Sequence, residues 1–476
     1  MHTPFFPHWR PRLAALGRRV HVLRQQSLCH LELLLAPFLP PGLLAQAEEG
    51  ANSRDRIYTL RRTFFGFLYQ VLKPGTSCRE IVRQIQALFA LHAAGPVDEN
   101  TSAYCQGRRR LPLDTLCRLR VETAAAGEKS AERWHGLRPK VIDGTSVSAP
   151  DTRKNQRAYP QSASQKPGCG FPHLKLVGLF SLATGVLLGY AKGNKHQHDL
   201  RLLRGLLDLL RPGDLALADR GFCSYVLLAL LLRGGVASLF RLHQSRSKDL
   251  RKGQRLGKND RLFTWRKPAR KPRWLPQSRW EKIPAQLTVR VLRYNLSCPG
   301  YRPEAVTLVT TLVDPQAYRA QDLAQLYTRR WKIELWFRDI KTSMGMEVLH
   351  CKSPQMLHKE LEMFFIAYNL IRCLMVQAAV SNDVELNRMS FKGTVDSVRQ
   401  FSLAIAQARS KRKHNQLILE LLEVIARDEV PERPNRREPR AIKRRRKFFP
   451  LLTKPRHSFK DPPRIRRAEI IKTPKK

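Results

Sequence analysis

The stretch Tyr327-Thr-Arg-Arg-Trp-Lys-Ile-Glu-Leu-Trp-Phe-Arg-Asp-Ile-Lys341 is the most informative part of the chain. Charged and apolar residues recur in it at helical spacing, without glycine or proline, which predicts a helix. With about 3.6 residues per turn, a stripe roughly 60° wide on that helix carries four polar groups, which are Tyr327, Arg330, Glu334 and Lys341. One carboxylate among phosphate-binding groups on a rigid face suits metal-assisted chemistry on nucleic acid.

An ordinary role for the same helix is the alternative. Glu334 and Arg338 are four residues apart, so they could form a solvated ion pair with no chemical function. Trp331, Leu335 and Trp336 would then simply be core residues. The rest of the chain decides between these two interpretations.

The composition indicates a basic protein that binds a negatively charged partner. The chain has 476 residues, enough for about two to four domains, and 42% of them are hydrophobic, which is ample for a core. Its formal net charge of +47 favours a polyanion, of which nucleic acid is the most common. A cationic protein of the membrane surface is the competing class. No run of about 20 uncharged apolar residues is present, so we expect no transmembrane helix and no membrane partner.

Cysteine usage indicates a reducing compartment. Nine cysteines are scattered singly, and none forms a CxxC pair. A structural zinc site and a disulfide framework are therefore both disfavoured. The first twenty residues are basic but lack the continuous apolar segment of a secretory signal. We expect a cytoplasmic protein associated with the nucleoid.

Positive charge is concentrated near the C-terminus. Residues 431–476 contain 18 Lys and Arg against 4 Asp and Glu, a net charge of +14, with Lys443-Arg-Arg-Arg-Lys447 at the centre. Such a segment cannot bury enough apolar surface to fold alone. We expect a disordered arm that lies on the phosphate backbone, with a solubilising tail as the alternative.

Residues 1–135 are predicted to be mostly helical. Ile57 to Leu72 and Cys78 to Leu91 show apolar spacing of three and four, and Ser77 with Glu80 forms a capping box. The segment 104–112 is interpreted as an exposed basic turn that carries Arg108, Arg109 and Arg110. A DNA-binding module fits this pattern, and a helical dimerisation domain is the alternative.

The periodicity becomes β-like from Lys140 onward. Apolar runs and turns predict the order β, β, β, α, β, α, β up to about residue 242, with a hairpin turn at Ala183-Thr-Gly185. This order resembles a ribonuclease H-like core, in which three antiparallel strands lead into a parallel extension. The first strand would be central and the fourth would lie beside it.

Two acids follow apolar runs in this region. Asp143 ends Lys140-Val-Ile-Asp, and Asp219 ends Asp214-Leu-Ala-Leu-Ala-Asp. A carboxylate there is costly unless it is paired or bound to a metal. On adjacent strands the two could share a metal pair. The alternatives are a turn residue before Gly144 for Asp143 and an ion pair with Arg220 for Asp219.

Residues 244–318 are predicted to be a β-rich insertion. Gln286 to Tyr294 alternates strictly, and Ala305 to Val313 is strongly β-branched. Trp265, Trp274 and Trp280 lie near many cations here, which suits stacking of exposed bases. Tryptophan as sheet core is the alternative for each.

Taken together, these features resemble the DDE transposases of bacterial insertion sequences, specifically the insertion sequence four family. The matching pieces are Asp143-Gly-Thr, Ala218-Asp-Arg-Gly-Phe222 and the Tyr327/Arg330/Glu334/Lys341 set. That set fits the family signature Tyr-x2-Arg-x3-Glu-x6-Lys at every position. The basic segment 104–112 and the tail from Arg437 also look like those of family members, although Gly107 replaces the alanine expected there.

The resemblance implies cut-and-paste transposition by phosphoryl transfer on double-stranded DNA, namely terminal inverted repeats and target DNA. Asp143, Asp219 and Glu334 would be catalytic and would hold two Mg²⁺ ions, which Mn²⁺ could replace. Similar family members release the element end through a DNA hairpin with a flipped base. Two protomers would pair two ends in a synaptic complex. The implied DNA contacts are Tyr327, Arg330, Lys341, Arg220, Trp274, Trp280, Arg108, Arg109 and Arg110.

Two rival functions remain open at this point. One is a structure-specific nuclease with the same fold that cuts without joining, and the other is a non-enzymatic DNA-binding repressor. The expected divisions are a helical N-terminal DNA-binding region at 1–135, the first part of the core at 136–243, the β-rich insertion at 244–318, the remainder of the core with the glutamate helix at 319–382, a C-terminal helical region at 383–430 and the basic tail at 431–476.

Overall fold

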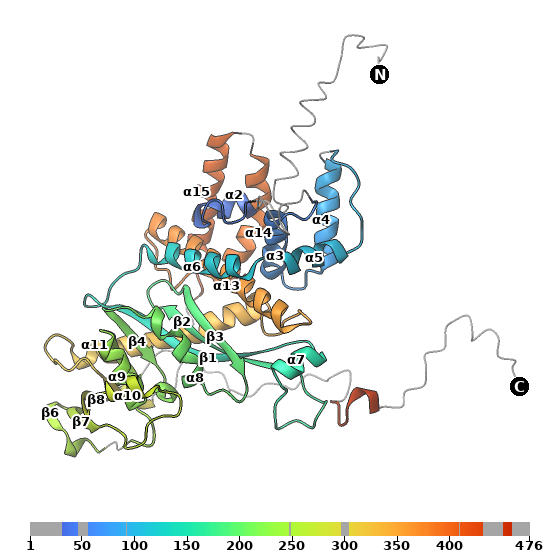
Figure 1. The fold of residues 1–476 in the computed structure, drawn as a ribbon. Helices are drawn as coiled ribbons and strands as arrows, with labels where there is room; N and C mark the ends of the chain where they lie inside the picture. Colours follow the sequence, from blue (N-terminus) through green and yellow to red (C-terminus); the bar gives the residue numbers. More distant parts are fainter. Residues whose placement is uncertain are drawn as a thin grey trace, which may run out of the picture.

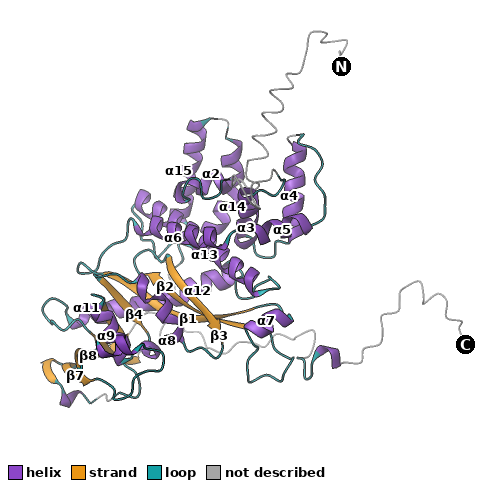
Figure 2. Cartoon of the chain, viewed as in Figure 1, coloured by secondary structure: helices purple, strands orange, loops and turns teal. Residues whose placement is uncertain are grey.

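A computed structural model describes residues 31–45, 56–91, 93–246, 249–296, 304–408, 410–431 and 451–458. Helices gather above a large sheet, and further helices cover the faces of that sheet (Figures 1 and 2). The chain is therefore a mixed α/β protein, as the sequence predicts. The basic centre of the tail, Lys443 to Lys447, lies outside the described residues.

One sheet of nine strands organises the described chain, in the order β3-β2-β1-β4-β5-β9-β8-β7-β6. β1 is antiparallel to β2 and parallel to β4, so the first strand is central and the fourth lies beside it, as expected. The first five strands are consistent with a ribonuclease H-like core. Their bounds are β1 Arg138–Ser148, β2 His173–Ser181, β3 Leu187–Asn194, β4 Asp214–Ala218 and β5 Ala237–Arg241.

The β-rich segment is a continuation of this same sheet. Strand β9 pairs with β5 in the core on one side and with β8 on the other, both antiparallel. The strands predicted from alternation are present, and their hydrogen bonds join them to the core without a break. The bounds are β6 Gln254–Gly257, β7 Asp260–Arg266, β8 Gln286–Leu296 and β9 Glu304–Thr310.

Alternation along the strands divides the interior into two apolar cores. Val141 packs in the core shared with the long helix α13, Pro354–Asn382, whereas the next residue, Ile142, packs in the core beneath α9, Tyr225–Arg233. Successive side chains of a strand point to opposite faces, so a buried strand supplies both cores. The helices on the α9 side also include α8 Asp199–Leu203, with the 3-10 turns η3 Arg204–Leu209 and η4 Arg220–Phe222.

The N-terminal helices share the core of α13. Ser77 caps α4 as predicted, because its Oγ accepts from the backbone N–H of Glu80 at 3.2 Å. The bounds are α2 Leu31–Leu35, α3 Leu60–Leu72, α4 Cys78–Leu91, α5 Ser102–Arg110 and α6 Leu113–Glu128, with the 3-10 turn η1 Ala36–Phe38 after α2.

The interpretation of 104–112 as an exposed turn is wrong, because most of it is helix α5. Tyr104 is fully buried, and its hydroxyl donates to Gln70 Oε1 at 2.6 Å. A Cβ atom at Gly107 would come within 2.9 Å of Thr63 Oγ1, so glycine allows α5 to approach α3 closely. Tyr104, which is buried, and Gly107, which allows the close contact, lie three residues apart just before the three arginines and hold the segment as a docked helix.

Helix α13 is long and apolar enough to cross a membrane by length and composition, but 89% of its most apolar window is buried inside the protein. It is the central core helix, with α6, α14 and α15 packed around it. The remaining bounds are α7 Arg153–Ala158, η5 Leu250–Lys252, α10 Gln277–Glu281, α11 Ala320–Thr328, α14 Phe391–Gln407, α15 Lys411–Arg427 and η8 Arg456–Ser458.

Candidate active site

The segment 320–343 forms one helical path with three changes of pitch. Helix α11 leads into the 3-10 turn η6 Arg329–Trp331, then α12 Lys332–Arg338, then the π-helical turn η7 Asp339–Ser343. The predicted helix is therefore present, although it is not uniform. Single π-turns inside helices are frequent at functional sites. Here the π-turn carries Lys341.

The pairing of β1 with β4 places two of the predicted acids side by side. The last residue pair of that ladder is Ile142 with Ala218, and the next residue on each strand is Asp143 or Asp219. Adjacent strands lie about 4.8 Å apart. The two acids therefore leave neighbouring strands at the same level of the sheet.

The alternatives for these two acids do not hold. Asp143 was expected to end its strand, but β1 continues to Ser148 because Gly144 and the residues after it keep pairing with β2. Asp143 is therefore an in-strand residue opposite Gly178 and not a turn residue. Among the described side chains, Asp219 forms no ion pair with Arg220, which is exposed.

Arg330 links the first acid to the third. Its Nη1 lies 3.4 Å from Oδ2 of Asp143, and its Nη2 lies 4.0 Å from Oε1 of Glu334. The Arg330 side chain is 7% exposed, whereas that of Glu334 is 58% exposed. One guanidinium buried between two carboxylates holds the helix η6–α12 against β1.

Electrostatics show that three acidic charges converge at Asp143. Burial raises the pKa of Asp143; the Gly144 N–H and Arg330 oppose that rise, and the charges of Asp219 and Glu334 add to it. The Gly144 N–H donates to Asp143 Oδ1 at 2.8 Å. Mutual repulsion among acids that lie in a cleft is the condition that a bound cation relieves.

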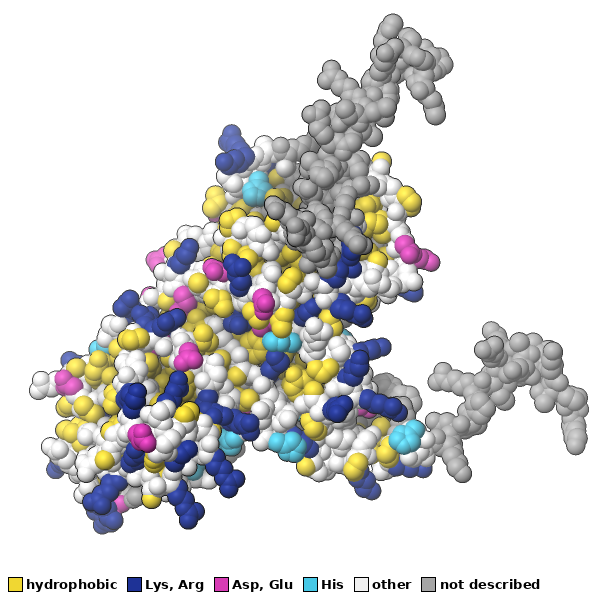
Figure 3. Space-filling model, viewed as in Figure 1, with side chains coloured by type: hydrophobic (Ala, Val, Ile, Leu, Met, Phe, Trp, Pro, Cys, Tyr) yellow, Lys and Arg dark blue, Asp and Glu magenta, His cyan; other side chains and the backbone are white. Residues whose placement is uncertain are grey.

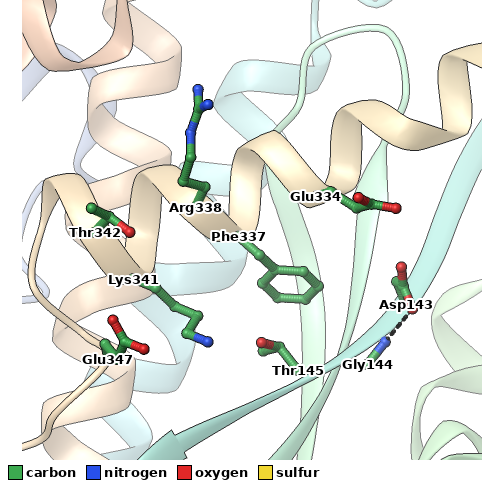
Figure 4. Close-up of a pocket in the computed structure, with 9 residues that line it drawn as sticks. All are labelled: Asp143, Gly144, Thr145, Glu334, Phe337, Arg338, Lys341, Thr342 and Glu347. Carbon is green, nitrogen blue, oxygen red and sulfur yellow. Dashed lines mark hydrogen bonds between the residues drawn. The ribbon is translucent and has the colours of Figure 1, made fainter. Parts of the chain in front are cut away.

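A cavity of about 320 Å³ opens beside these residues. Asp143 and Thr145 reach it from β1, and Glu334, Phe337 and Lys341 reach it from the helix (Figure 4). In the same view the amino group of Lys341 lies near Thr145, and Arg338 extends away from the other residues. The cavity can therefore hold a phosphate group between the acids and the amino group of Lys341.

The structure brings Tyr327 to the site in a different role from the one expected. It is 2% exposed, and its hydroxyl donates to the backbone oxygen of Ala218 at 3.4 Å. Burial, the largest cause, raises the pKa of Tyr327, so the phenol stays neutral. A phosphate contact needs an exposed hydroxyl, whereas this one fixes the residue directly before Asp219.

Neither tryptophan expected to stack a flipped base is among the residues that line the cavity. The Arg204 guanidinium lies 4.8 Å from the centroid of the Trp274 ring. The Lys267 amino group lies 4.2 Å from the centroid of the Trp280 ring. Both tryptophans pack against the α9 core. One face of each ring is therefore already covered by a cation.

The three arginines of α5 are placed differently from one another. Arg109 is exposed and Arg110 is partly exposed. The Arg108 guanidinium instead lies 3.8 Å from the centroid of the Phe67 ring. Arg108 is thus only partly exposed and its guanidinium packs against Phe67, which differs from its expected place on a DNA-binding surface.

Several cavity residues were missed by sequence reasoning, among them Thr145 and Glu347. Thr145 lies two residues after Asp143 on β1 and shares its face, so the period of a strand could have identified it. Glu347 lines the cavity because the backbone N–H of Ser148 donates to its carbonyl oxygen at 2.9 Å. That contact joins segments far apart in the sequence, so no local pattern predicts it.

A separate group of possible metal ligands lies between α6 and α13. Cys117, His358 and Glu362 have donor atoms within 4.8 Å of one another. The Glu362 carboxylate already accepts from Arg120 Nε at 2.9 Å and from the Tyr190 hydroxyl at 3.0 Å. Burial is the largest cause that raises the pKa of Cys117, to about 11, so its thiol stays protonated. This group serves packing better than it serves metal binding.

Comparison with known proteins gives three findings. The family model described as "Transposase DDE domain" matches residues 134–370. Transposase InsG for insertion sequence element IS4, from Escherichia coli (strain K12), is 27% identical over 449 residues, covering 91% of this chain and 97% of that protein. Among solved structures, the cryo-EM structure of the piggyBac transposase synaptic complex with hairpin DNA shows 9% identity and a TM-score of 0.39, over 91% of this chain and 89% of the other.

Proposed function

Because the chain belongs to the IS4 family of DDE transposases, we propose that it moves an insertion sequence by cut-and-paste transposition. It binds terminal inverted repeats, nicks the element end, excises the element and joins the 3′-end to target DNA. The observation that supports this most is the arrangement of Asp143, Asp219 and Glu334. They come from two neighbouring strands and one helix, and the charges of the other two act on Asp143.

The acids fit a divalent metal. They offer hard carboxylate oxygens, and the charges of Asp219 and Glu334 repel that of Asp143, an effect that Arg330 opposes. In our proposal Asp143, Asp219 and Glu334 hold two Mg²⁺ ions, which Mn²⁺ can replace. Bound there, the ions would supply an activated oxygen nucleophile and charge stabilisation for the leaving oxygen.

Other residues of the chain position this set. Arg330 holds Asp143 and Glu334 at fixed separation through its two terminal nitrogens. Tyr327 holds the end of β4 through the Ala218 carbonyl and so places Asp219. Lys341 lines the cavity, has no ion pair among the described residues and is proposed to bind a phosphate of the strand being cut.

The DNA path extends beyond the cavity in this proposal. Lys and Arg side chains outnumber Asp and Glu on the face drawn in Figure 3, mostly over the sheet in its lower half. Exposed Arg220 and Arg109, with Arg110, contact the phosphate backbone, and a homodimer pairs the two ends. A free face of Trp274 or Trp280 remains the proposed platform for a flipped base. The core is proposed to be ribonuclease H-like.

A strand-transfer assay with labelled ends that carry the inverted repeats tests the function. With Mg²⁺ and target DNA the chain should give joined products. Glu334→Gln, at an exposed position, should keep DNA binding and lose both cutting and joining. Cuts without joined products would favour a nuclease. Binding with no Mg²⁺-dependent cleavage in the unaltered chain would leave only the DNA-binding alternative.

A further inference from the structure

Outside the candidate active site, the Arg108 guanidinium contacts two cysteine sulfurs. Its Nη1 lies 3.4 Å from the sulfur of Cys78 on α4, and its Nη2 lies 3.1 Å from the sulfur of Cys351, just before α13. No carboxylate of the described residues forms an ion pair with this guanidinium, and its Nε has no hydrogen-bond partner there. A packed cation without a carboxylate requires another anion nearby.

Cys78 is the thiol best placed to supply that anion. It is the first residue of the 14-residue helix α4, where the positive end of the helix dipole favours negative charge. It is half-buried and accepts from Gln70 Nε2 at 3.8 Å as well as from Arg108. The Cys105 thiol donates a hydrogen bond to it, and this is the largest cause that lowers the pKa of Cys78, to about 5.

The other titratable groups at this junction are accounted for. The hydrogen bond to Cys78 raises the pKa of Cys105, and burial raises the pKa of Cys351, so both thiols stay protonated. Glu360 accepts the backbone N–H groups of His350 and Cys351, each at 2.9 Å, and lies 3.4 Å from the His350 ring. The charge of Glu360 also acts on Arg108, but no hydrogen bond or ion pair joins the two among the described residues, whereas the Cys78 sulfur lies 3.4 Å from the guanidinium.

We propose that Cys78 is a reactive thiolate and a site of reversible oxidation by hydrogen peroxide, with Cys105 as the resolving thiol. The Cys78 sulfur attacks one peroxide oxygen, the O–O bond breaks, and a sulfenic acid and hydroxide form. The Cys105 sulfur then attacks the sulfenic sulfur and releases water, which gives a Cys78–Cys105 disulfide. Sulfur loses two electrons and the peroxide gains them.

The site joins the N-terminal helices to the core, which gives oxidation a structural consequence. Arg108 of α5 contacts Cys351, and the carbonyl oxygen of the next residue, Arg109, accepts from Lys359 of α13 at 2.6 Å. Disulfide formation removes the anion beside Arg108 and leaves that cation unbalanced. The inference is independent of the proposed DNA chemistry and stands or fails separately from it.

Alkylation of the full chain tests the thiolate. The protein is treated with iodoacetamide from about pH 5 to about pH 9, and the rate at each cysteine is read by peptide mass spectrometry. Cys78 should react with a midpoint well below the value of about 8.5 for a free thiol, and before the more exposed Cys105. Cys105→Ala, on the helix surface, should raise that midpoint. A Cys78 midpoint like that of a free thiol, or one unchanged by Cys105→Ala, would overturn the proposal.

Peroxide treatment tests the second step. The unaltered chain should lose the mass of two hydrogens and give a Cys78–Cys105 linked peptide that dithiothreitol separates. Cys105→Ser keeps an O–H donor but cannot form the disulfide, so Cys78 should accumulate as a sulfenic acid that a cyclic diketone traps. A cross-link to any other cysteine, or no modification of Cys78, contradicts the assignment.

Discussion

Two arginine–aspartate contacts on the same sheet differ in almost every respect. In the β7–β8 pair, Arg290 Nε and Nη2 lie 2.9 and 2.6 Å from the two oxygens of Asp260, and these side chains are 1% and 7% exposed. At the acid cluster, Arg330 approaches one oxygen of Asp143 at 3.4 Å, and the Asp143 side chain is 25% exposed. We call the first contact closed, because it is buried and bidentate. We call the second open, because the arginine approaches only one carboxylate oxygen and the acid is partly exposed.

The difference shows that one sheet holds, at separate places, an ion pair that stabilises the fold and acids that remain available for a reaction. A bidentate pair uses both oxygens of its acid and leaves nothing to bind a further cation. The open contact shares one guanidinium among acids whose charges still repel one another. Carboxylate oxygens there remain available, which is the condition for a metal-dependent reaction.

The largest expected effect comes from neutralising an acid of the open contact. Asp143→Asn or Asp219→Asn should lower the rate of Mg²⁺-dependent DNA cleavage by about 10³- to 10⁴-fold, because several kcal/mol of transition-state stabilisation is lost. DNA binding, measured by gel shift without metal, should be kept. Cleavage is followed in single turnover with a labelled element end.

Asp199→Asn is the matched control for that comparison. Its carboxylate lies against Gly144, the next residue of β1, but on the opposite face of the strand, and it pairs with Lys175 at 3.0 Å. This variant should keep most of the cleavage rate. Equal losses in Asp143→Asn and Asp199→Asn would contradict the assignment of Asp143 to the site.

Breaking the closed contact should affect folding instead. Asp260→Asn leaves Arg290 buried without a counter-ion and should lower the free energy of unfolding by about 3–5 kcal/mol. Urea denaturation measures the loss, and cleavage by the folded fraction should be unchanged. The double variant Asp260→Leu/Arg290→Met removes both charges and should recover much of the stability. If Asp260→Asn were as stable as the parent chain, the Asp260–Arg290 pair would contribute little to the free energy of unfolding.

Local patterns predicted the parts of the fold that depend on short-range order. Apolar runs before Asp143 and Asp219 identified both strands, and their order predicted that β1 is central. The spacing of Arg330 and Glu334 predicted that they share a helical face, and Arg330 contacts both Asp143 and Glu334. These features follow from the periods of strands and helices.

Long-range contacts account for what the patterns missed. Pairing of β9 with β5 makes the insertion part of the main sheet, and no local signal specifies a partner strand. The cationic run at Arg108 suggested a surface turn, but Tyr104 and the Gly107 contact with Thr63 dock it as a helix. Burial of Tyr327 against Ala218 likewise depends on two segments more than a hundred residues apart.

A third acid near an arginine offers an intermediate case. Burial, the largest cause, raises the pKa of Asp339 from 3.8 to about 6, although Arg372 and Arg338 oppose the rise. The Arg372 guanidinium donates to the Thr184 carbonyl oxygen at 2.9 Å through Nε and forms no ion pair with Asp339 among the described residues. Asp339 is thus enclosed but not paired.

Asp339→Asn should therefore stabilise the fold at neutral pH. Since the folded-state pKa is raised, the contribution of Asp339 to stability is fully present below its unfolded pKa of about 3.9 and is lost as pH rises through about 6. The free energy of unfolding of the variant should exceed that of the parent chain by up to about 3 kcal/mol at about pH 8, and the two should be equal at about pH 4. Urea denaturation at both values measures this. A difference that does not change with pH would show that Asp339 does not titrate in this way.

The smallest expected effect concerns the cation beside the open contact. Lys341→Gln should weaken binding of an element end by about tenfold, since one charged phosphate contact is worth about 1.5 kcal/mol. The slope of log affinity against log salt should become shallower by about 0.9, because one fewer counterion is released. Arg329→Gln removes the same charge from the same helical path. Arg329 is exposed but is not among the residues that line the cavity, so this change should alter the affinity and the slope much less. Equal slopes in the two variants would mean that Lys341 acts only through the general positive field, and the open contact would then lack a phosphate-binding residue on its helix.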